Sequence, residues 1–100
     1  MLAHSVYFSL NDNSPPAIQA MVDACKTYLA DHPGVIFFAA GTLNRDLSRP
    51  VNDLDFDVAL HVVFDSKASH DAYQVAPSHQ LFVQENKPNW KWVRVFDADV

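Results

Sequence analysis

Hydrophobic and polar residues alternate along residues 3–10 and again along residues 56–64. A period of two residues is typical of a β-strand that buries one face. Residues 35–43 and 92–97 are rich in residue types that favour strands. We therefore predict four strands over these ranges. The first strand is expected to bury the face that carries His4, Val6, Phe8 and Leu10.

The chain between the first two strands has the periodicity of a helix. Ser14 and Pro15 are a typical helix start, and apolar residues then recur at helical spacing to about residue 31. Residues 32–34, His-Pro-Gly, end this helix, because the residue before a proline avoids the helical conformation and glycine accepts a left-handed one. Two more helices are predicted, one after Asp65-Ser66 to about residue 75 and one over residues 77–86.

Residues 44–55 are polar and have no apolar period, so we expect a long surface loop there. The predicted order of elements is that of the ferredoxin-like βαββαβ fold. This is an α+β fold in which helices cover one face of a four-stranded antiparallel sheet. No repeat, linker or change of composition divides the 100 residues, and we predict a single domain over residues 1–100.

The sheet face that points away from the helices is too apolar to remain in water. We expect it to carry Tyr7, His61, Val63, Trp92, Arg94 and Phe96. Two copies of the chain are therefore predicted to pack sheet against sheet, as a homodimer that closes a dimeric α+β barrel. A charged Arg94 in such an interface requires a carboxylate partner, for which Asp57 is the expected residue.

Charge and composition narrow the range of partners. Seven Lys and Arg residues against twelve Asp and Glu residues give a net charge of -5, which argues against nucleic acid as a partner. The longest wholly apolar run, residues 35–40, is far short of the ~20 residues that cross a bilayer, and residues 1–5 lack the features of a signal peptide. The only cysteine, Cys25, cannot form an internal disulfide. We expect a cytoplasmic protein with no membrane partner.

The histidine and carboxylate spacing shows no metal-binding motif. His32 and His70 are expected to be solvated, and neither belongs to an HxH or HExxH pattern. Asp53, Asp55 and Asp57 are expected to form part of a solvated face. Cys25 is expected to be an inert thiol on the buried face of its helix. The spacing therefore predicts no metal ion and no cofactor.

Several segments, in order and at their spacing, resemble the stress-responsive A/B-barrel domain (Dabb) family of dimeric α+β barrels. They are Leu2-Ala3-His4-Ser5-Val6-Tyr7-Phe8, His32-Pro33-Gly34-Val35, Asp57-Val58-Ala59-Leu60-His61-Val62-Val63-Phe64, His70-Asp71-Ala72-Tyr73, and Ala76-Pro77-Ser78-His79 with Phe82. The resemblance covers nearly all of residues 2 to 100 and implies the ferredoxin-like fold and dimerisation. Most of the family has no known reaction.

The resemblance also implies a candidate site. In the polyketide cyclases of this family a tyrosine, a histidine six residues later and a histidine on the first strand line a pocket between sheet and helices. Tyr73, His79 and His4 match that pattern. His79 would act as general base and Tyr73 as hydrogen-bond donor. A second strand histidine often seen in the family is replaced by Val58 here, which argues against cyclase activity.

Each of these three residues also has a purely structural interpretation, as a core histidine, a helix-start histidine or a packed tyrosine. We therefore expect a homodimer that binds a small apolar or aromatic ligand between sheet and helices, with no established reaction. The side chains expected to surround the ligand are Phe8, Met21, Tyr28, Leu60 and Phe82. The alternatives are an enzyme similar to the polyketide cyclases or, by fold analogy alone, a cofactor-free monooxygenase.

Overall fold

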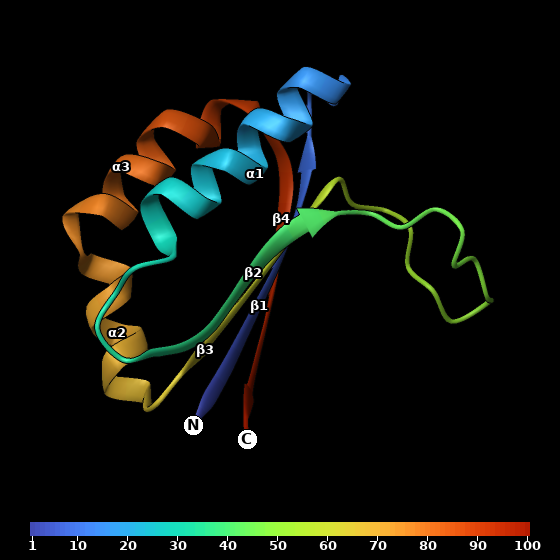
Figure 1. Ribbon diagram of the computed structural model, residues 1–100. Coiled ribbons are helices and arrows are strands. Elements are labelled where there is room, and N and C mark those ends of the chain that lie inside the picture. Colours follow the sequence, from blue (N-terminus) through green and yellow to red (C-terminus); the bar gives the residue numbers. More distant parts are fainter.

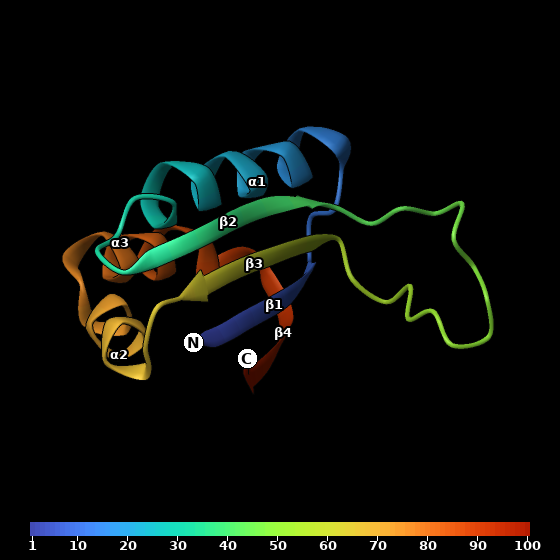
Figure 2. The same cartoon turned by 60° about the horizontal axis from the view of Figure 1, so that its bottom comes forward.

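The computed structural model describes all 100 residues and shows one sheet with helices on one side (Figure 1). Its elements are β1 (Leu2–Leu10), α1 (Pro15–Leu29), β2 (Val35–Thr42), β3 (Val58–Phe64), α2 (Lys67–Val75), α3 (Pro77–Asn86), a short 3-10 helix η1 (Lys87–Asn89) and β4 (Trp90–Asp99). The long connection between β2 and β3 extends away from the helices (Figure 1). The two chain termini lie side by side at one end of β1 and β4 (Figure 2).

The four strands form one antiparallel sheet in the order β2-β3-β1-β4. This is the arrangement of the ferredoxin-like fold, and it confirms the α+β class predicted from the sequence. On β1, Val6 pairs with Leu60 of β3 and with Val95 of β4. Because side chains alternate along a strand, this register places His4, Val6 and Phe8 on the helix side.

Local sequence signals explain where the helices begin and how the chain turns between them. Proline occupies the first turn of both α1 and α3, where its missing N–H costs no hydrogen bond. Ser66 caps α2 by accepting a hydrogen bond from the Ser69 backbone N–H. Gly34 has a φ of 86°, and its carbonyl accepts a hydrogen bond from Asp65, which holds the turn before β2 against the start of α2.

The hydrophobic core lies between the inner face of the sheet and the three helices. Its fully buried side chains come from all parts of the fold and include Cys25 and Leu29 of α1, Val58 and Val62 of β3, and Tyr73 of α2. Met21 belongs to the same core. None of the helices combines the length and the apolar character needed to cross a lipid bilayer.

Some predicted boundaries need correction. The last strand runs from Trp90 to Asp99 rather than from 92 to 97, α1 ends at Leu29, and β3 begins at Val58 rather than at residue 56. Phe56 therefore does not follow the alternation of β3. Its ring packs edge-on against Tyr7 of the outer face, 5.0 Å between centroids.

The predicted Arg94–Asp57 ion pair is wrong. Asp57 is buried and accepts a hydrogen bond from the backbone N–H of Leu10, so it is neither solvated nor directed to the outer face. Arg94 pairs instead with Asp53 of the long connection, 2.7 Å from nitrogen to oxygen. The part of the connection that leads into β3 brings this carboxylate within reach of the outer face, which strand alternation cannot predict.

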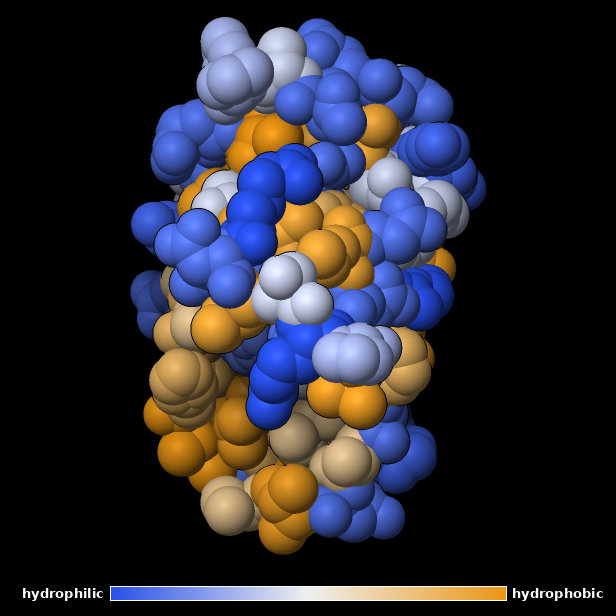
Figure 3. All heavy atoms as spheres, turned by 90° about the vertical axis from the view of Figure 1, so that its right-hand side faces the viewer, coloured by the Kyte–Doolittle hydropathy of each residue, from blue (hydrophilic) through white to orange (hydrophobic).

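The outer face of the sheet carries the six side chains expected there. Tyr7, His61, Val63 and Trp92 are half-buried, and Arg94 and Phe96 are exposed. Tyr7 contacts both His61 and Phe96, with ring centroids 5.9 Å apart in each pair. Seen from this side, hydrophobic residues form patches in the middle and the lower part of the surface, between polar ones (Figure 3).

Candidate functional site

A small apolar pocket of about 160 Å³ lies between the inner face of the sheet and the helices. Thirteen residues from β1, β3, β4 and all three helices line it, and ten of them are hydrophobic. The polar side chains in this lining are His4, Gln74 and His79, together with the hydroxyl of Tyr73. The pocket can therefore surround an apolar body and offers polar contacts at a few points only.

Three elements bring His4, Tyr73 and His79 to this pocket. His4 comes from β1, Tyr73 from α2 and His79 from the first turn of α3. The Tyr73 and His79 rings meet edge-on at 4.8 Å between centroids, and the His4 and Tyr73 rings at 6.1 Å. The break at Ala76-Pro77 separates the two helices, so that Tyr73 and His79 approach the same space from different directions.

Two of these three side chains have no hydrogen-bond partner in the protein. Neither the Tyr73 hydroxyl nor the His79 ring has a hydrogen-bond partner in the protein, and both residues line the pocket. The indole N–H of Trp90, another lining residue, is buried without a partner. Buried polar groups normally find partners, and unpaired groups that cluster at one pocket point to a ligand with a polar atom.

Burial sets the protonation of these groups. Desolvation raises the pKa of the Tyr73 hydroxyl well above its usual range, with a smaller contribution from Cys25. Desolvation also lowers the pKa of His79, and His32, His4 and His70 add to this by charge repulsion. The pKa of His4 is lowered by burial, against the opposing effect of Asp97. At neutral pH, Tyr73 is therefore a hydrogen-bond donor and His79 an uncharged acceptor.

The five side chains expected to surround a ligand separate into two groups. Phe8, Leu60 and Phe82 line the pocket. Met21 is buried elsewhere in the core, and Tyr28 donates a hydrogen bond to Glu85 of α3, 2.6 Å away. The helical period places Met21 and Tyr28 on the buried side of α1 but cannot say which part of the core each one reaches.

The prediction that His32 and His70 are solvated is wrong. The His32 ring packs edge-on against Tyr73 at 5.1 Å between centroids, and its Nε2 lies 3.0 Å from the Ser78 hydroxyl. The His70 side chain is mostly buried against His4 and Phe64. His70 precedes Tyr73 by three positions, so the shared helix face was the signal that could have placed it inward.

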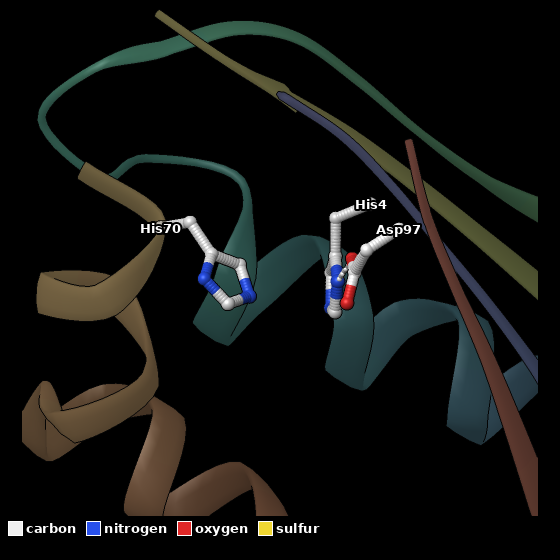
Figure 4. Close-up of side chains that lie close together, drawn as sticks. All are labelled: His4, His70 and Asp97. Carbon is white, nitrogen blue, oxygen red and sulfur yellow. Dashed lines mark hydrogen bonds and ion pairs between the residues drawn. The ribbon is translucent and has the colours of Figure 1, made fainter. Parts of the chain in front are cut away.

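A second group of side chains lies beside the pocket, and no sequence pattern indicated it. His4 and Asp97 pair across β1 and β4, with Nδ1 of His4 2.5 Å from a carboxylate oxygen of Asp97. The ring of His70 projects from α2 toward this pair (Figure 4). Nitrogen or oxygen atoms of all three side chains lie within 4.8 Å of one another.

The outer face has a separate hollow. It measures about 500 Å³ and lies between the sheet and the long connection, with Tyr7, Arg94 and Phe96 from the sheet and Val51, Asp53 and Phe56 from the connection among its walls. It is more open and more polar than the inner pocket and contains none of the three residues considered for catalysis.

Comparison with known proteins agrees with this architecture. The family model described as the stress responsive A/B barrel domain matches residues 2–100. No curated protein matches the chain.

Solved structures with the same fold share little sequence with it. A dimeric ferredoxin-like protein of unknown function from Thermobifida fusca is 21% identical, with a TM-score of 0.81 over 99% of this chain and 90% of that one. A Dabb family protein from Mesorhizobium loti is 22% identical, with a TM-score of 0.81 over 99% and 95%. The hydroxynitrile lyase from Passiflora edulis is 18% identical, with a TM-score of 0.79 over 99% and 92%. At these identities the comparison establishes the fold.

Proposed function

The chain belongs to the stress responsive A/B barrel (Dabb) family, and from this we propose that it is a homodimeric protein that binds a small apolar or aromatic molecule in its inner pocket. The observation that carries the proposal is the pocket itself, in which unpaired polar atoms of Tyr73 and His79 face an apolar lining. Such a pocket favours a ligand with one hydrophobic body and one polar group.

The volume of the pocket limits the size of the ligand. A cavity of about 150 Å³ in a protein core holds one benzene molecule, and the pocket measures about 160 Å³. The ligand is therefore a single ring or a short branched chain. Its apolar part would pack against Phe8, Leu60 and Phe82. Its hydroxyl or carbonyl oxygen would accept a hydrogen bond from Tyr73.

The homodimer is supported by the outer face of the sheet. Tyr7, Val63, Trp92 and Phe96 leave apolar surface there, and the helices lie on the other face of the sheet. The ferredoxin-like protein from Thermobifida fusca is described as dimeric. A second copy packed on this face would remove that surface from water, with an expected interface above roughly 1,000 Å².

A second candidate function is proton transfer, and the protonation of the site favours it. An uncharged His79 next to a protonated Tyr73 has the arrangement of a general base beside a hydrogen-bond donor. One structural neighbour, from Passiflora edulis, is a hydroxynitrile lyase. An enzyme similar to the polyketide cyclases would use His79 as the base and Tyr73 as the hydrogen-bond donor. A cofactor-free monooxygenase has fold analogy as its only support.

Ligand-observed NMR with a fragment panel tests the proposal. Phenol, benzaldehyde and acetophenone are compared with toluene and with cyclohexanol, on the wild type and on Tyr73→Phe and His79→Ala. We expect the three aromatic oxygen compounds and cyclohexanol to bind more tightly than toluene, which has no oxygen, and both variants to lose affinity for them. Tyr28→Phe is the matched control, because it also removes one hydroxyl but outside the pocket. Fragments that bind equally to all variants, or none that bind, would contradict the proposal.

The enzyme alternative has its own readout. Exchange of the α-hydrogens of acetophenone for deuterium requires removal of a proton beside the carbonyl. Exchange that the wild type accelerates and His79→Ala does not would favour catalysis. Binding without accelerated exchange would favour the ligand-binding function.

A further inference from the structure

We propose that His4, His70 and Asp97 form a binding site for one divalent transition-metal ion of the Zn²⁺ type. The three side chains come from β1, α2 and β4 and meet at one edge of the fold (Figure 4). The site is separate in its chemistry from the ligand pocket and does not depend on the proposed function, although His4 contributes to both.

The donor set indicates the class of metal. Two imidazole nitrogens and one carboxylate oxygen are the protein ligands of several catalytic zinc sites and of non-haem iron sites. Magnesium and calcium prefer oxygen donors throughout, so two histidines argue against them. Three protein ligands also leave at least one position for water or another small ligand.

The distances between the three donor atoms are near those of a zinc site, and small side-chain movements would adjust them to an ion. Ligand atoms about 2.0–2.2 Å from a zinc ion at tetrahedral angles lie roughly 3.3–3.5 Å apart. The widest separation among the three donor atoms is 4.8 Å. The narrowest, between His4 Nδ1 and Asp97 Oδ1, is 2.5 Å, short enough to be bridged by one shared proton. Metal binding at Nδ1 would displace that proton, leaving His4 protonated on Nε2 instead, move the two atoms about 1 Å further apart and draw His70 inward.

The surroundings of His70 prepare one of its nitrogens for a metal. Nδ1 lies 3.1 Å from Oδ1 of Asp71 and donates its proton to that carboxylate. The side-chain NH2 group of Gln74 lies 3.4 Å from Nε2, a long contact that a metal ion at this nitrogen would replace. The carboxylate–histidine arrangement is the usual second shell of a metal-bound histidine, because it fixes the tautomer and the orientation of the ring.

Access and charge are also suitable. His4 is buried and His70 mostly so, whereas the Asp97 side chain is 42% exposed, so that an ion can enter from the side of β4. The chain has a net charge of -5, which favours a cation. Asp71 adds a carboxylate beside His70 and is itself held by Lys67 at 2.6 Å.

Isothermal titration of chelator-treated protein with Zn²⁺ tests the proposal, and Co²⁺ serves as a spectroscopic probe. We expect one equivalent per chain and the visible absorption of a four- or five-coordinate Co²⁺ complex. Asp71→Asn removes the carboxylate that holds the ligand His70, and loss of such a second-shell partner reduces metal affinity by roughly 10–100-fold. Asp97→Asn and His70→Ala each alter a ligand itself and should reduce the affinity for Zn²⁺ by more than this. Both ligand variants alter partly exposed side chains, and circular dichroism establishes that they fold.

Two controls separate this site from unspecific binding. Asp99→Asn makes the same charge change two residues further along β4, and His61→Gln removes an imidazole on the outer face. Both should bind Zn²⁺ as the wild type does. A wild type that binds no Zn²⁺, or ligand variants that bind as tightly as the wild type, would overturn the proposal. Neither result bears on the fragment-binding experiment, which is carried out in the presence of a chelator.

Discussion

His4 and Asp97 lie directly opposite each other on β1 and β4, and the carboxylate of one contacts the ring of the other at 2.5 Å. The histidine is buried and the aspartate is half exposed. The pair therefore joins the inner wall of the pocket to the surface of the protein. The His4 ring also contacts Tyr73 edge-on, 6.1 Å between centroids.

Asp97→Asn is expected to destabilise the fold by about 1 kcal/mol, because the buried His4 loses a charged hydrogen-bond partner while water can partly replace it at this half-exposed position. Urea unfolding of the metal-free protein measures the change. Asp99→Asn should leave the free energy of unfolding within about 0.5 kcal/mol of the wild type, as is usual for exposed positions. Equal stability of all three proteins would show that the pair contributes nothing.

Tyr73→Phe is expected to change stability little, because the hydroxyl has no partner in the protein to lose. Tyr73→Ala should cost about 3–5 kcal/mol, the usual price of removing a buried ring. Chemical denaturation of the two variants measures the difference. A large loss in Tyr73→Phe would mean that the hydroxyl has a structural role.

The stability of the protein is expected to fall as the pH decreases from 7 toward 5. Burial and the neighbouring His32, His4 and His70 lower the pKa of His79 below its ordinary value of 6.5. The unfolded chain therefore takes up a proton more readily than the folded one, so the stabilisation from a neutral His79 is complete above pH 6.5 and is lost as the pH falls through the folded-state pKa.

Urea unfolding at several pH values measures this effect, with His79→Gln as the comparison. The variant should show a smaller loss of stability over the same range, because it has no proton to take up at this position. The remaining slope would come from the other histidines of the cluster. An unchanged slope in the variant would exclude a contribution from His79.

His61→Glu is expected to weaken the proposed homodimer. His61 lies on the outer face, where its ring contacts Tyr7 and its Nδ1 lies 3.1 Å from the Ser5 hydroxyl. In the dimer interface, the new carboxylate would face either apolar side chains or the same carboxylate of the second copy. It would then lose its hydration without gaining an oppositely charged partner. Sedimentation velocity at micromolar concentration should show a dimer for the wild type and more monomer for the variant.

Gln84→Glu is the matched control for this experiment. Gln84 is exposed on α3, on the helix side of the sheet, and the substitution adds the same charge. It should remain as dimeric as the wild type. A wild type that sediments as a monomer would contradict the dimer itself.

Cys25 is expected to resist thiol reagents in the folded protein. The side chain is fully buried, and burial raises its pKa to about 12, so almost no thiolate forms at pH 8. Reaction with a disulfide reagent should be slow in native buffer and fast in denaturant. Rapid reaction in native buffer would show that α1 opens readily.

The fold could be predicted because its signals are local. Alternation along residues 3–10, the prolines that start α1 and α3, and Gly34 at a left-handed turn each act through near neighbours in the chain. The order of elements then restricts the topology to very few choices. The prediction failed where alternation ended, since Phe56 and Asp57 precede β3 and take directions that no period describes.

The candidate site is only partly a property of the sequence. The strand period places His4 inward, and resemblance to the family drew attention to Tyr73 and His79. The inward positions of His32 and His70 depend on how α2 and the turn before β2 pack against the sheet. Solvent exposure of a histidine on a short helix is decided by that packing rather than by the type of residue.

The sequence by itself determined the strands, the helices and the faces that the strands bury, because these follow from backbone preferences and side-chain periods over a few residues. Only the tertiary structure decided which distant side chains touch. His4 and Asp97 are 93 positions apart, and Arg94 lies 41 positions from Asp53. Their contacts depend on strand register and on the path of a long connection, which are set by the packing of the whole domain.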